Sequence, residues 1–132
     1  MLVVDASVAI KWFLLEPGRD EARRLQRLIA PELIVAEVTN ALWKRVMAGQ
    51  ITARQGIAAS TALTQLLEPL LPIAPLAARA LAIAGELRHP ADDCFYLALA
   101  ESRDLKLITA DRRLVARLAG TPWQDRCLRL WN

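Results

Sequence analysis

Four acidic residues occupy positions from which an α/β protein could use them together. Asp5 directly follows an apolar, β-branched stretch, and Asp111 follows a second apolar run that ends near Thr109. Asp93 lies at the start of an apolar helical pattern, and Glu37 lies within another. Because open α/β sheets bind ligands at the carboxyl ends of their strands, we expect these carboxylates to converge at one sheet edge.

Such a cluster of carboxylates predicts metal chemistry. Four carboxylates at close range repel one another and raise each other's pKa, so a divalent cation is needed to neutralise them. Oxygen ligands without sulfur or imidazole suit Mg²⁺ or Mn²⁺. One or two such ions can activate a water and stabilise the leaving oxygen during in-line attack on a phosphodiester. His89 is the single histidine, which argues against zinc sites and histidine-based nucleophile triads.

Several of these residues also have simpler structural interpretations. Asp5 can serve only to cap the helix that follows it, and Glu37 can lie on an exposed helical stripe. His89 precedes Pro90 and is more typical of a turn residue than of a ligand. The arginines after Asp111 could bind a phosphate backbone or could be ordinary surface charge; they are Arg112, Arg113 and Arg117.

The spacing of apolar residues, and the Gly and Pro residues that interrupt it, predict the helices and strands that must position these acids. The pattern predicts strands at residues 2–4, 70–73, 105–109 and 127–131, and weakly at 28–30. It predicts helices at residues 6–15, 19–29, 32–48, 52–67, 76–88, 92–103 and 112–118. This alternation predicts a three-layer α/β/α fold with a mostly parallel sheet of four or five strands. The apolar helices of residues 32–67 suit either core packing or a homodimer surface.

The length and composition of the chain favour one folded domain over residues 1–132. Hydrophobic residues make up 55% and charged residues 23%, which excludes an intrinsically disordered chain. The net charge of +3 permits nucleic-acid binding without indicating it. Cys94 and Cys127 are too few for a disulfide scaffold, so we expect reduced thiols and a cytoplasmic location. No signal peptide or membrane span is visible.

Two motifs carry a family resemblance. The stretch DCFYLALAE at residues 93–101, followed by LITAD at 107–111, resembles PIN-domain ribonucleases, specifically VapC-type toxins of bacterial toxin–antitoxin pairs. VVDAS at residues 3–7 and EVTNAL at 37–42 extend the resemblance along most of the chain. It implies a PIN-like domain, and an endoribonuclease toxin that hydrolyses RNA phosphodiesters by a metal-activated water. A VapB-type antitoxin partner is implied as well.

Carried over residue by residue, the resemblance assigns the catalytic acids to Asp5, Glu37, Asp93 and Asp111. Ser7 and Thr109 match the polar neighbours of those acids. Asp5 and Asp93 lie at element ends and are the expected direct ligands of Mg²⁺, with Mn²⁺ as the alternative ion. Glu37 and Asp111 are expected to complete the site directly or through water.

The residue before the third acid departs from the family pattern. The family often has an aromatic residue there, and this chain has Asp92. Asp92 could join the metal site or could simply cap the helix that begins nearby.

Other fold families with an acid after the first strand fit less well. A haloacid-dehalogenase-like phosphatase needs a second acid two residues later, where Ser7 stands. A receiver domain needs paired acids at that strand end and a late lysine, and neither pattern is present. A PIN-like scaffold that binds RNA or protein without cleaving it is the remaining alternative, and metal-dependent cleavage would distinguish the two.

Overall fold

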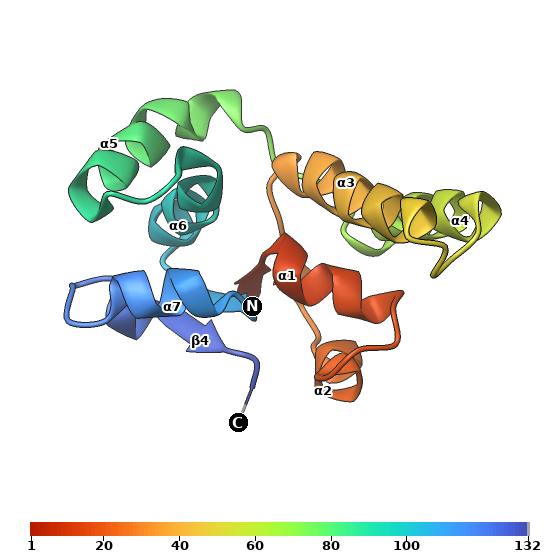
Figure 1. Ribbon diagram of the computed structural model, residues 1–132. Coiled ribbons are helices and arrows are strands. Elements are labelled where there is room, and N and C mark those ends of the chain that lie inside the picture. The colour runs from red at the N-terminus through yellow and green to blue at the C-terminus, as the bar shows by residue number, and fades with distance from the viewer. Residues whose placement is uncertain (132) are drawn as a thin grey trace.

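A parallel sheet of four short strands forms the centre of the computed structural model, which describes residues 1–131 (Figure 1). The strands are β1 (Leu2–Val4), β2 (Leu28–Ile29), β3 (Lys106–Thr109) and β4 (Cys127–Arg129). Their order across the sheet is β2-β1-β3-β4, so the first strand of the chain pairs with β3 from near its other end. The predicted mostly parallel sheet is therefore confirmed, with four strands.

Helices cover both faces of this sheet. Successive residues of a strand point to opposite faces. Val3 and Val4 are nevertheless both fully buried, and so are Leu107 and Thr109 with Ile108 nearly so. Helix α6 (Ala91–Arg103) packs against β1 and β3, while α1 (Ala6–Ala9) packs against β3. The predicted three-layer α/β/α arrangement follows from this two-sided burial.

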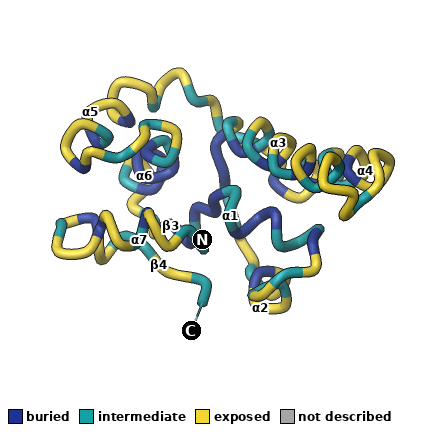
Figure 2. Tube along the Cα trace, viewed as in Figure 1, coloured by how far each residue is buried: buried dark blue, intermediate teal, exposed yellow. Residues whose placement is uncertain are grey.

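The remaining helices extend away from the sheet. Helices α3 (Leu33–Met47) and α4 (Ala53–Leu66) form a hairpin that projects to one side, and α5 (Ala77–Leu87) packs on α6 (Figure 1). Short helices α2 (Arg19–Arg24) and α7 (Arg112–Leu118) lie between strands in the chain. Burial is concentrated in β1, β3 and α6, whereas much of the α3–α4 hairpin is exposed (Figure 2). No helix within residues 1–131 is long and apolar enough to cross a membrane.

The prediction of one helix over residues 19–29 is wrong in its second half. Helix α2 ends at Arg24, and Arg27 adopts a left-handed φ of 59°. The chain then enters β2, where Leu28 and Ile29 pair with Leu2 and Val3 of β1. Pairing with a buried neighbouring strand outweighs the helical pattern, and the weakly predicted strand near residues 28–30 is the correct interpretation.

The predicted strand at residues 70–73 is also wrong. Only a single bridge forms there, between Leu71 and Pro31. The Leu71 N–H donates to the Ala30 carbonyl, and the Glu32 N–H donates to the Leu71 carbonyl. Proline has no N–H to donate, so Pro69 and Pro72 cannot extend this pairing into a ladder. The helix predicted for residues 6–15 is likewise shorter, because α1 passes into a 3₁₀ turn at Ile10–Trp12.

Candidate active site

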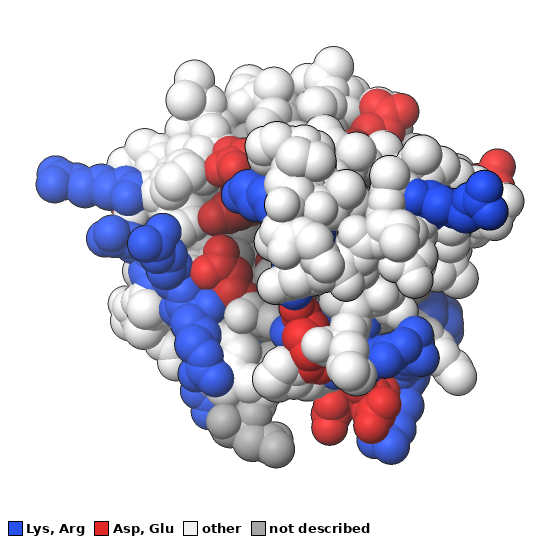
Figure 3. Space-filling model, turned by 45° about the vertical axis from the view of Figure 1, so that its right-hand side comes forward, with Lys and Arg blue, Asp and Glu red and all other residues white. Residues whose placement is uncertain are grey.

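Acidic side chains gather in a recess on one face of the molecule, and a band of Lys and Arg side chains runs beside it (Figure 3). The acids whose charges act on one another come from four separate parts of the chain. Asp5 follows β1, Asp111 follows β3, Glu37 lies in α3, and Asp92 and Asp93 begin α6. Parallel strands and helix ends therefore deliver the carboxylates to one side of the fold, as the strand-end rule predicts.

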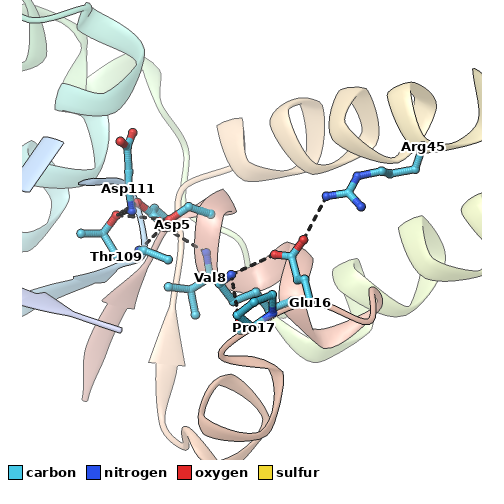
Figure 4. Close-up of polar contacts among 10 residues, drawn as sticks. Asp5, Val8, Glu16, Pro17, Arg45, Thr109 and Asp111 are labelled. Atoms are coloured by element: carbon cyan, nitrogen blue, oxygen red, sulfur yellow. Dashed lines mark hydrogen bonds and ion pairs between the residues drawn. The ribbon is translucent and has the colours of Figure 1, made fainter. Parts of the chain in front are cut away.

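Asp5 is the most deeply buried of these acids, with 6% of its surface exposed. Its Oδ1 accepts hydrogen bonds from the Ser7 hydroxyl at 2.5 Å and from the Val8 N–H at 3.2 Å. Its Oδ2 accepts a hydrogen bond from the Thr109 hydroxyl (Figure 4). Asp5 does cap α1, as the simpler interpretation holds, but the capping bond is one of several that fix its carboxylate.

Ser7 and Thr109 tie the end of β1 to the end of β3. The Ala110 N–H donates to the Ser7 hydroxyl at 2.8 Å, and the Asp111 N–H donates to the Thr109 hydroxyl at 3.0 Å. Asp111 lies beside Asp5 and Thr109 in Figure 4 and caps α7, since its Oδ1 accepts from the N–H groups of Arg113 and Leu114. These hydrogen bonds fix the positions of Asp5 and Asp111 relative to each other.

Glu37, Asp92 and Asp93 form the tightest group of acids. One carboxylate oxygen from each lies within 4.8 Å of the others, a spacing that could hold a metal ion. Asp92 also accepts a hydrogen bond from the Asp93 N–H at 3.0 Å. Asp92 therefore lies both in the first turn of α6 and next to the predicted site residues.

Two residues that the sequence analysis did not place in the site hold members of this group. The buried Tyr96 hydroxyl donates to Glu37 Oε1 at 2.5 Å. His89 Nε2 lies 2.7 Å from Asp93 Oδ2, and only 8% of the His89 side chain is exposed. Tyr96 follows Asp93 by three residues and so shares its helix face, which was an available signal. His89 precedes Asp93 by four residues, which is a helical spacing, but it lies in the turn before α6 and Pro90 stands between the two.

Burial and mutual repulsion weaken the acidity of the group. Burial raises the pKa of Asp5 to about 6, although hydrogen bonds from Ser7 and Thr109 lower it. Burial raises the pKa of Glu37 to about 7, and the negative charges of Asp92, Asp93 and Asp5 add to this effect. Burial also raises the pKa of Asp93, with contributions from Asp92 and Asp111, against the lowering effect of His89.

These observations fit a divalent cation. The donors are carboxylate oxygens, which Mg²⁺ and Mn²⁺ prefer. Ionising the acids together is unfavourable in this buried setting, and a nearby positive ion would remove that cost. Of the four predicted acids, Glu37 and Asp93 lie in the closest group, where Asp92 joins them, while Asp5 and Asp111 flank it closely enough for their charges to act on its members.

Comparisons of family, sequence and structure each find proteins similar to this chain. The PIN domain family matches residues 2–120. Ribonuclease VapC1 of Mycobacterium tuberculosis is 36% identical over 102 residues, which cover 76% of this chain and 74% of the relative. Ribonuclease VapC9 of the same organism is 32% identical over 114 residues, or 86% and 88% of the two chains. A toxin–antitoxin complex from Klebsiella pneumoniae shares the fold with a TM-score of 0.73, covering 100% of this chain and 99% of that one at 19% identity.

Proposed function

This chain belongs to the PIN-domain family, and on that basis we propose that it is an endoribonuclease, the toxin of a type II toxin–antitoxin pair. We further propose that it hydrolyses RNA phosphodiesters with the help of a divalent cation. The observation that carries this function is the crowding of Glu37, Asp92 and Asp93 beside the buried Asp5. The relatives named VapC1 and VapC9 are ribonucleases, which supports RNA as the substrate.

We propose Asp5 and Asp93 as direct ligands of Mg²⁺, with Mn²⁺ able to replace it. Glu37 and Asp111 would complete the site directly or through water. When bound, the cation supplies the positive charge that activates a water and offsets the charge developing on the phosphate. The proximity of Asp92 to Glu37 and Asp93 supports a further contribution of that residue to the ion's surroundings.

The protein's own side chains would keep the ligands in position. Ser7 and Thr109 hold both oxygens of Asp5, and His89 holds one oxygen of Asp93. Burial raises the pKa of Tyr96, which keeps its hydroxyl protonated as a donor to Glu37. Interactions of this kind around metal ligands commonly change metal affinity or activity by about 10–100-fold.

The exposed face of the α3–α4 hairpin is suited to contacts with another protein. It carries large apolar side chains that are more than half exposed, and these are Trp43, Met47, Ile57 and Leu66. A groove of about 410 Å³ between the two helices includes the first three of them. We propose that this hairpin buries surface against a second copy of the chain or against a VapB-type antitoxin. An RNA substrate and two free cysteines fit action in the cytoplasm.

A ribonuclease assay with and without Mg²⁺ tests the proposed activity. The wild-type chain should cleave single-stranded RNA with Mg²⁺ or Mn²⁺ and should be inactive in excess EDTA. The Asp5→Asn variant keeps the side-chain shape and the capping ability of residue 5, because Asn and Asp cap helices about equally well. Equal cleavage by a folded Asp5→Asn variant, or cleavage that ignores EDTA, would refute the metal-dependent proposal.

A further inference from the structure

An open cavity of about 680 Å³ adjoins the acidic site. Its lining includes Ala110, whose N–H donates to Ser7, and Arg112, which directly follows Asp111. Arg129 of β4 and Trp131 form another part of the wall. The cavity therefore lies next to Asp111, on the side of the acidic site that faces α7 and β4.

Two guanidinium groups converge on one aromatic ring in this cavity. The Arg112 guanidinium carbon lies 4.6 Å from the centroid of the Trp131 ring, and that of Arg129 lies 5.9 Å from it. Such cation–π contacts hold long side chains in place without neutralising them. Within residues 1–131 neither arginine forms an ion pair, whereas Arg79 and Arg126 do, with Glu101 and Asp104.

The other charged residues of the cavity lining do not cancel this positive charge. They are Lys11, Glu16 and Glu21. Lys11 Nζ lies 2.9 Å from Glu16 Oε1, and Arg45 lies 3.0 Å from Glu16 Oε2, so both oxygens of Glu16 are already paired. Glu21 is the remaining acid of the lining and is exposed to water. With Glu16 paired, two arginines face one exposed glutamate, and the cavity keeps a net positive charge for a ligand.

We infer that this cavity binds a nucleotide unit of single-stranded RNA next to the phosphodiester that is cut. This inference rests on the proposed function. The planar guanidinium groups of Arg112 and Arg129 match the geometry of a phosphate, and Trp131 is the aromatic surface that keeps them together. Proteins that bind single strands combine a basic groove with aromatic side chains in this way.

An RNA-binding measurement that needs no cleavage tests the inference. A short fluorescein-labelled single-stranded RNA is titrated with the protein in EDTA, and fluorescence anisotropy is read at several salt concentrations. The Arg112→Gln/Arg129→Gln double variant should bind roughly tenfold or more weakly, since the hydrogen bonds from a guanidinium to a phosphate are charge-assisted. Its salt dependence, as log Kd against log salt, should become shallower by about 0.7 for each phosphate that is no longer neutralised.

Matched controls separate a local site from general charge. Arg54→Gln removes one positive charge from α4, away from the cavity, as Arg112→Gln and Arg129→Gln each remove one within it; Arg54→Gln should leave affinity nearly unchanged. Trp131→Phe should retain most of the binding that Trp131→Ala loses. In Mg²⁺ the double variant should show a raised KM with kcat largely preserved, because neither arginine is proposed to touch the reacting atoms.

Two results would overturn the inference. One is an unchanged Kd and salt slope in the double variant, and the other is a loss of binding in Arg54→Gln as large as in the single variants Arg112→Gln and Arg129→Gln. A wild-type chain that binds RNA through these arginines but never cleaves it would count against the proposed function instead, and would leave the binding site standing.

Discussion

Asp93 connects the closest group of acids to His89. It lies in the closest group of acids, its Oδ2 contacts His89, and its pKa is raised by burial and by Asp92 and Asp111. Asp5 differs, because both of its oxygens are held by hydroxyl groups. Hydroxyl groups therefore fix Asp5, and a histidine fixes Asp93. Substitutions at the two acids should disturb different neighbouring residues.

Replacing Asp93 with Asn should reduce Mg²⁺-dependent RNA cleavage by roughly 100-fold or more, because a charge that faces the cation is removed. Single-turnover cleavage measures this effect, and circular dichroism checks that the variant is folded. Asp92→Asn is the matched comparison one residue away. Cleavage by Asp93→Asn at the wild-type rate would contradict the assignment, and a larger loss in Asp92→Asn would move the ligand role to Asp92.

His89 should act by positioning Asp93. His89→Ala should weaken Mn²⁺ binding about tenfold, within the range typical of residues that hold metal ligands. His89→Asn keeps a hydrogen-bond donor and should recover part of that affinity. Electron paramagnetic resonance of free Mn²⁺ during titration measures binding without relying on catalysis. Equal Mn²⁺ affinity in His89→Ala and wild type would show that the contact has no positioning role.

The buried acids should make the metal-free protein less stable as pH rises. Asp5 and Glu37 have pKa values of about 6 and about 7 in the folded protein, against 3.8 and 4.5 as ordinary values. Between about pH 4 and pH 7 the folded state then holds more protons than the unfolded state, so raising the pH favours unfolding. Because one pKa unit corresponds to about 1.4 kcal/mol, we expect the free energy of unfolding to fall by several kcal/mol across this window, with about 6 kcal/mol as the upper limit.

Denaturant unfolding in EDTA at several pH values measures this change. The Asp5→Asn/Glu37→Gln double variant lacks both titrating groups, so its curve should be flatter and it should be more stable than wild type near pH 7. Added Mg²⁺ should stabilise the wild type most at the upper end of the window. Identical pH dependence in the wild type and the double variant would contradict the prediction.

Helices and strands could be predicted where the local residue pattern agreed with the contacts that the element makes in the fold. Helix α6 and strand β3 have long apolar runs and clear ends, and Thr52 with Gln55 marks the start of α4. The chain between Leu25 and Ile29 carries a helical pattern that is overruled by pairing with β1, a contact that no local window contains. The acids were identifiable from strand ends and motif, whereas the contact of His89 with Asp93 depends on the shape of the turn between α5 and α6, where Arg88 adopts a left-handed φ of 52°.

The start of α4 gives a test at the scale of one element. Thr52 accepts a hydrogen bond from the Gln55 N–H, and the Gln55 side chain accepts one from the Thr52 N–H. Thr52→Ala should therefore destabilise the protein by about 1 kcal/mol, whereas Thr52→Ser should be nearly neutral. Thermal unfolding measures both variants. A loss in Thr52→Ser equal to that in Thr52→Ala would show that the hydroxyl cap is not what stabilises this end.

At the scale of the whole molecule, the α3–α4 hairpin should control assembly. Trp43→Glu and Ile57→Glu place charges in its apolar groove and should reduce the mass measured by light scattering, or the co-elution with the antitoxin. Leu81→Glu on α5 is the matched control, because Leu81 and Ile57 are each 69% exposed. Unchanged mass and unchanged antitoxin binding in both groove variants would contradict the proposal, as would an equal effect of Leu81→Glu.

The bond between Asp5 and Thr109 joins residues that are 104 positions apart in the chain. During synthesis on a ribosome, Asp5 emerges early but can acquire this partner only after β3 has emerged and paired with β1. Contacts of such long sequence separation form late, because the entropy of closing a long loop opposes them. A chain that stops before β3 thus lacks a formed site, so a cell making this ribonuclease is exposed to its activity only once β3 has been translated.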